Sequence, residues 1–134
     1  MSARADTLHR IDAALAELSA LDASLTAARR AQWPGIDRGD AVRRFQAVAQ
    51  AAEGDHAFAA VQELAALAEK IADGADRSIV HTAGEFEAVQ HAADVLSLLL
   101  RDMGHRLLGR RGADVAPAAA ALRERLEHML MAVR

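Results

Sequence analysis

Residues 84–103 read GEFEAVQHAADVLSLLLRDM, and this stretch decides the fold. At alternating steps of three and four it carries apolar residues: Phe86, Val89, Ala93, Leu96, Leu100 and Met103. This spacing is typical of one face of a helix of about five turns. The face is wider than the stripe of a two-stranded coiled coil, because it also includes Ala92, Val95 and Leu99. The stretch therefore predicts a central helix with neighbours on more than one side.

The composition predicts an all-α protein. The 134 residues include 34 alanines and 16 leucines but only 2 prolines, and aromatic residues make up 3%. Residues that favour strands are sparse, and nowhere does an alternation of polar and apolar residues persist. A chain of this length can bury a core of its own, so we expect residues 1–134 to form a single helical-bundle domain.

Four more helices are predicted around the central one. Each has its own apolar stripe, and together they cover about residues 6–31, 40–52, 56–72 and 114–133. Breaks are indicated by Pro34 and Gly35, by the triplet at 53–55, by the Asp-Gly pair at 73–74, and by a basic, glycine-containing connection at 101–111. Short connections favour antiparallel neighbours. We therefore expect five helices, arranged as an up-and-down antiparallel four-helix bundle with an additional C-terminal helix.

Several classes of protein are disfavoured by composition. The chain has no cysteine, so it has no disulfide framework and no thiolate metal site, which fits a cytoplasmic protein. The N-terminus has no signal-peptide pattern, and no apolar run approaches the roughly 20 residues of a membrane span. A net charge of −3 disfavours nucleic acid as a partner. The many arginines and alanines suggest a bacterial source.

The histidines suggest metal binding only weakly. Three pairs of His and Glu lie four residues apart and could share a helix face: His81 with Glu85, Glu87 with His91, and Glu124 with His128. Di-metal bundles instead use Glu followed three residues later by His on two helices, and this pattern is absent. Neither a nucleophile elbow nor a glycine-rich phosphate loop is present. We expect no metal, no cofactor and no catalytic residue, so the chain is interpreted as a non-enzyme.

The basic connection leaves two interpretations open. Its charged residues, Arg101, His105, Arg106, Arg110 and Arg111, could bind a phosphate group or an acidic partner. Such a run is more often a solvated loop with favourable charge at a helix C-terminus.

A longer stretch, residues 45–74, reads FQAVAQAAEGDHAFAAVQELAALAEKIADG and resembles the histidine-phosphotransfer domains, especially those at the N-terminus of chemotaxis-type histidine kinases. In that family one helix carries an exposed histidine, a basic residue three positions later and a glycine at four. When Gly54 is placed on that glycine, Leu64, Leu67 and the Asp-Gly ending align without a gap. The HAADVLSLLL sequence beginning at His91 is similar to the next helix of the family.

The chain departs from the family at the residues that carry the chemistry. Gln50 occupies the position of the phosphate-accepting histidine, and Glu53 occupies the position of the basic residue. Glutamine has no nucleophilic ring nitrogen, and glutamate repels a phosphoryl group. The resemblance therefore implies a non-catalytic (pseudo-) phosphotransfer module that docks a receiver domain or a histidine kinase. Its predicted binding face consists of Gln46, Gln50, Glu53, Gly54 and Phe58, with the first three exposed.

Two alternatives stay open. In the first, the chain relays phosphate through His56 or His81. In the second, it is a structural or adaptor bundle that forms a homo-oligomer through the helix at 114–133. That helix offers apolar surface on two sides, from Leu122, Leu126, Met129, Leu130 and Val133.

Overall fold

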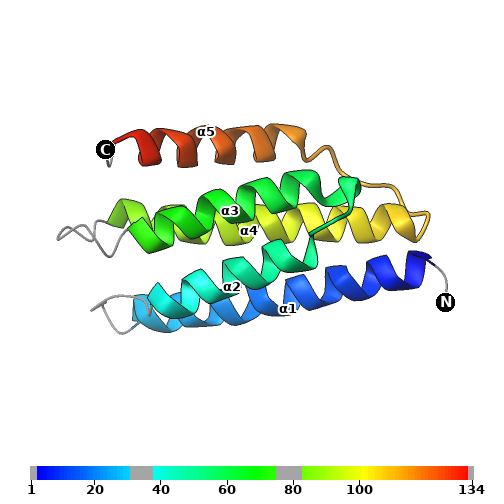
Figure 1. The fold of residues 1–134 in the computed structure, drawn as a ribbon, viewed down its shortest axis with the longest axis horizontal. Helices are drawn as coiled ribbons and strands as arrows, with labels where there is room; N and C mark the ends of the chain where they lie inside the picture. Colours follow the sequence, from blue (N-terminus) through cyan, green and yellow to red (C-terminus); the bar gives the residue numbers. More distant parts are fainter. Residues whose placement is uncertain (1–2, 31–37, 75–82, 133–134) are drawn as a thin grey trace.

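A computed structural model of the protein describes residues 3–30, 38–74 and 83–132 (Figure 1). These residues form α-helices and one short 3-10 helix: α1 (Ala3–Arg30), α2 (Arg38–Ala51), η1 (His56–Phe58), α3 (Ala59–Gly74), α4 (Ala83–Leu107) and α5 (Ala116–Ala132). The predicted all-α class is confirmed. No helix in these ranges combines the length and the hydropathy needed to cross a membrane.

The first four α-helices form a bundle in which each packs against two neighbours. α1 packs on α2 and α4, and α3 packs on the same two helices. Successive helices run in opposite directions, as Figure 1 shows. α5 lies outside this bundle, against α3 and α4, and runs antiparallel to α4. The arrangement is the expected up-and-down bundle with one additional C-terminal helix.

The stretch at 84–103 forms most of α4, and it is the most widely buried helix. Its buried side chains cover a broad arc rather than a narrow stripe: Phe86, Ala88, Val89, Ala92, Ala93, Val95, Leu96, Leu99 and Leu100. The breadth of the arc follows from three neighbours, because α4 contacts α1, α3 and α5. Burying a leucine side chain contributes about 1.5–3 kcal/mol. α4 supplies more buried side chains than any other described helix, in agreement with the central position that its sequence predicts.

The prediction of a basic connection at 101–111 is wrong for residues 101–107, which are helical. α4 continues to Leu107, so Arg101, His105 and Arg106 lie on the helix. Gly109, two residues after the end of the helix, has a φ of +74°. Two backbone hydrogen bonds close this end, from Arg110 N to His105 O (2.8 Å) and from Gly109 N to Arg106 O (3.1 Å). This is a Schellman ending, which depends on a left-handed glycine after the last helical turn. The glycine that stops α4 is therefore Gly109, not the one at 104.

Polar side chains link the helices along their length. Arg44 on α2 donates to Glu17 on α1 (2.8 Å), and this hydrogen bond, followed by the charge of Asp40, raises the pKa of Arg44 above its ordinary value. Arg123 on α5 donates to both carboxylate oxygens of Glu63 on α3 (2.7 and 3.2 Å). The partly exposed Arg123–Glu63 pair contributes about 0.2–1 kcal/mol. Such links fix the register of the helices more than they stabilise the core.

Candidate functional site

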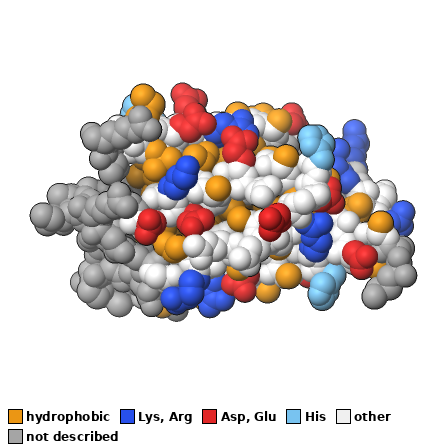
Figure 2. Space-filling view, viewed as in Figure 1, with side chains coloured by type: hydrophobic (Ala, Val, Ile, Leu, Met, Phe, Trp, Pro, Cys, Tyr) orange, Lys and Arg blue, Asp and Glu red, His pale blue; other side chains and the backbone are white. Residues whose placement is uncertain are grey.

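The predicted binding face lies on the outer side of α2. Gln46, Gln50 and Glu53 are all exposed, as predicted, while Phe45 and Val48 on the opposite side are fully buried. α2 and α3 lie nearest the viewer in Figure 1, so Figure 2 shows this side of the molecule, with acidic and basic side chains scattered across it. We call Gln46, Gln50, Glu53 and Gly54 the α2 face.

The side chains of the α2 face differ in their partners. Gln46 donates to the carboxylate of Glu69 on α3 (2.8 Å). Gln50 lies one turn further along α2, which runs antiparallel to α3. Within the described residues the Gln50 amide makes no hydrogen bond to another side chain. Gln50 therefore presents two donors and an acceptor to a partner.

The predicted break at residues 53–55 is present and has a defined geometry. Gly54 has a φ of +82°, a left-handed conformation in which a side chain is strained. Asp55 then begins η1, since its side chain accepts a hydrogen bond from Ala57 N (2.9 Å) and its carbonyl accepts one from Phe58 N (3.0 Å). This pattern is that of an Asp N-cap. The short break lets α3 turn back along α2.

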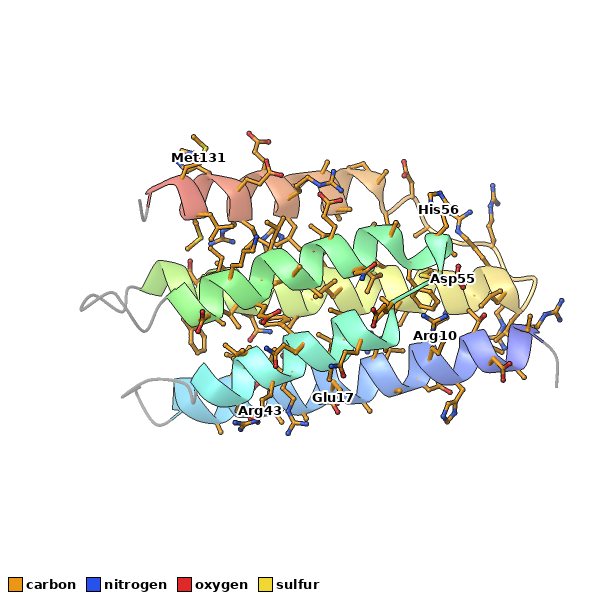
Figure 3. All side chains as sticks on the ribbon, viewed as in Figure 1. Arg10, Glu17, Arg43, Asp55, His56 and Met131 are labelled. Carbon is orange, nitrogen blue, oxygen red and sulfur yellow. The ribbon has the colours of Figure 1, made fainter. Side chains whose placement is uncertain are left out.

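Arg10, on α1, holds this break in place (Figure 3). Its Nε donates to Ala51 O (2.7 Å) and its Nη2 donates to Glu53 O (2.6 Å). Its Nη1 lies 3.7 Å from a carboxylate oxygen of Asp55. The last carbonyls of a helix have no partner within the helix, so Arg10 supplies partners for the end of α2. We call Arg10 with Ala51, Glu53, Asp55 and Phe58 the Arg10 clamp.

The assignment of Phe58 to the binding face is wrong. Its side chain is only 1% exposed, and the Arg10 guanidinium covers its ring at 4.6 Å from the centroid. The ring lies on the same side of the chain as Val61 and Leu64 and enters the core with them. Ala57 and Ala59, on either side of it, are exposed. Any apolar contact beside Gln50 therefore comes from these alanines.

The His–Glu pair at 87 and 91 has a partner other than a metal. His91 Nδ1 accepts a hydrogen bond from Arg125 Nη1 (3.2 Å), and Glu87 lies 3.9 Å from the same guanidinium. This His–Glu pair on α4 therefore binds an arginine of α5. The described residues contain no group of three or more side chains that could hold a metal ion. His56 is exposed in η1, whereas His81 and Glu85 lie in parts of the chain whose side chains the structure does not describe.

The outer side of α5 is less apolar than predicted. Leu122 and Leu126 are fully buried against the bundle, and Met129 and Leu130 are partly buried. Met131, which sequence analysis did not single out, is 71% exposed and points away from the bundle in Figure 3. Val133 lies outside the described residues.

The sequence analysis also did not predict the structural role of Arg10. Its partners lie 41 to 48 positions further along the chain, so no local spacing indicates it.

Comparison with protein-family models, with curated proteins and with solved structures finds no match for this chain.

Proposed function

We propose that this chain is a histidine-phosphotransfer-like module that lacks phosphotransfer chemistry and binds a signalling protein, either a receiver domain or a histidine kinase. The observation that carries the proposal is the exposed side chain of Gln50, four residues before the left-handed Gly54 at the end of α2. The family resemblance assigns this position to the phosphate-accepting histidine. An amide can contact a partner there, but it cannot accept a phosphoryl group.

The charges around Gln50 support a non-catalytic role. Glu53 is exposed one turn away, where the resemblance calls for a basic residue, and its carboxylate repels a phosphoryl group. Arg10 is close to the same break, but its guanidinium donates to the carbonyls of Ala51 and Glu53. Arg10 therefore supports the backbone here instead of offering its charge to a phosphate. The proposed partners act in bacterial two-component signalling, so the proposal implies a cytoplasmic, bacterial setting.

Titration of the chain with candidate receiver domains and histidine kinases tests the proposal. Replacing Gln50 by arginine puts a bulky cation in the centre of the α2 face, and we expect affinity to fall by about 1–3 kcal/mol, roughly 5- to 150-fold. The free energy of unfolding should change by less than about 0.5 kcal/mol, because Gln50 is exposed. Ala16→Arg, at an exposed position of α1, is the matched control and should leave affinity unchanged.

Two results would contradict the proposal. One is binding that is equally strong with Gln50→Arg, because the footprint would then lie elsewhere. The other is failure to bind any receiver domain or kinase while another kind of protein binds through a different face.

Phosphorylation of the chain is the alternative that the exposure of His56 favours. Incubation with a kinase or a small phosphodonor, followed by detection of acid-labile phosphate, distinguishes this alternative from the non-catalytic module that we propose. Under our proposal the native chain takes no label, and Gln50→His with Glu53→Lys is the variant designed to gain it. If the native chain takes label and the label disappears in His56→Ala or His81→Ala, the chain relays phosphate and the proposal is wrong.

Self-association is a second alternative, favoured by the exposed Met131. The mass of the chain in solution distinguishes it: a dimer that Met131→Ser converts to a monomer would assign the outer side of α5 to contact between copies.

A further inference from the structure

A groove runs between α1 and α4, on the side of the bundle opposite the α2 face. Its volume is about 340 Å³. The floor includes Leu18, which is 1% exposed, and Leu15 packs partly buried beside it. On the rim, Leu98 is 42% exposed, which is unusual for a leucine in the middle of a helix of this bundle. Ser19 and Ser97 also line the groove, so its surface is mixed. Leu15 and Leu98 supply its accessible apolar side chains, and no described segment covers them.

The two ends of the groove carry opposite charge. At one end the Gln90 amide donates to both Asp22 of α1 (2.8 Å) and Asp94 of α4 (3.1 Å). Within the described ranges neither carboxylate pairs with a cation, so two negative charges share one neutral donor. At the other end Arg101 is exposed and, among the described residues, makes no ion pair. Asp94 and Arg101 are seven residues apart on α4, about two turns or 10 Å.

The neighbouring groove shows how this bundle binds a helix. α5 fills the groove between α3 and α4 and runs antiparallel to α4 (Figure 1). It buries Leu122 and Leu126 completely. Its arginines bind acidic side chains of the two groove helices, Arg123 to Glu63 on α3 and Arg125 to Glu87 on α4. The α1/α4 groove offers part of the same pattern, namely two accessible leucines, Leu15 and Leu98, with carboxylates at one end; serines also line it.

We infer that the α1/α4 groove binds an amphipathic helix of a partner protein. The helix carries a stripe of leucine-like side chains that packs on Leu15 and Leu98, a basic residue that pairs with Asp22 and Asp94, and an acidic residue that pairs with Arg101. A helix with acidic residues first and basic residues last is favoured by its own dipole. With its basic end at Asp94, such a helix runs antiparallel to α4, as α5 does. This surface is separate from the α2 face and goes beyond the proposed function.

A designed peptide provides the probe. It is a capped, fluorescently labelled helix of about 14 residues, with leucines at steps of three and four in an alanine–glutamine background, glutamates in its first turn and arginines in its last. Binding to the whole chain is followed by fluorescence anisotropy. We expect saturable binding. Affinity should fall by about tenfold or more with Leu98→Arg, which replaces the exposed apolar side chain by a cation, and with Asp94→Lys, which reverses the charge of the acidic end.

Reversing the charge of the peptide as well as that of the groove makes the test specific. A second peptide, with its arginines replaced by glutamates, should bind the native chain about tenfold more weakly and bind the Asp94→Lys variant better than it binds the native chain. Ala16→Arg on α1 and Gln50→Arg on the α2 face should leave peptide binding unchanged, so this result is independent of the proposed function. Circular dichroism checks that the variants keep their helix content; both substituted positions, 94 and 98, are exposed.

Three results would overturn the inference. The first is absence of saturable binding to the native chain. The second is equal binding of the two peptides, since the charged ends would then select nothing. The third is a dimer of the chain that Leu98→Arg converts to a monomer, because the occupant of the groove would then be a second copy.

Discussion

Two junctions lie at the same end of the bundle, near the start of α1, and they are stabilised in opposite ways (Figure 1). The break between α2 and η1 is held by Arg10, which is 41 and 43 residues away from the carbonyls that it binds. The connection between α4 and α5 is held by its own residues. Asp102 accepts hydrogen bonds from Arg106 (2.9 Å) and from Ala113 N (2.8 Å), and Arg106 also donates to Ala113 O (3.1 Å).

The difference is one of sequence distance. The second junction forms from residues within eleven positions of one another, so it can assemble as soon as the end of α4 is helical. The Arg10 clamp forms only when α1 lies against α2, because its donor and its acceptors are on different helices. A local junction stabilises one connection, whereas the long-range clamp also ties α1 to the end of α2 and to η1.

The largest effect should come from removing the buried part of the Arg10 clamp. Phe58→Ala deletes a ring that is 1% exposed, and we expect the free energy of unfolding to fall by about 3–5 kcal/mol. Urea denaturation measures this. Leu108→Ala, at a leucine that is 50% exposed, is the control and should cost much less. If Phe58→Ala kept native stability and lost only partner binding, the ring would be a docking residue after all.

A smaller loss should follow from removing the guanidinium. Arg10→Ala leaves the carbonyls of Ala51 and Glu53 without these donors and uncovers Phe58. Since the side chain of Arg10 is 30% exposed, we expect a loss of about 2 kcal/mol in thermal or urea unfolding. Arg4→Ala changes an exposed arginine of the same helix and should have little effect. Equal effects of the two substitutions would show that the clamp adds nothing beyond surface charge.

The smallest effect should come from the local junction. A Cβ atom at Gly112 would overlap the Asp102 carboxylate and would lie 2.6 Å from Arg106 Nε. Gly112→Ala should therefore disturb these hydrogen bonds and destabilise by about 1 kcal/mol. Gly104→Ala, inside α4 with open space around it, should instead stabilise by up to about 1 kcal/mol. Differential scanning calorimetry should show shifts of opposite sign, and shifts of the same sign would contradict this account.

The sequence predicted features that depend on local spacing. The apolar stripe of α4 and the break at Gly54 follow from helical periodicity and from one glycine. The exposure of Gln50 also follows, because it lies opposite Phe45 on the same helix. The sequence could not predict the Arg10 clamp or the groove beside Leu98, since both depend on the register between helices. Phe58 was misassigned for the same reason, because the part of α1 that covers it is 48 residues away.

The position of α4 between three other helices has a consequence for the order in which the backbone opens. Its buried face contacts α1, α3 and α5, so its amide hydrogens reach solvent only when several interfaces separate together. α5 contacts the bundle on one side, and its outer side is already hydrated. In hydrogen exchange, α5 should therefore open as a separate unit at low free energy. The central amides of α4 should exchange last, at a rate set by unfolding of the whole molecule.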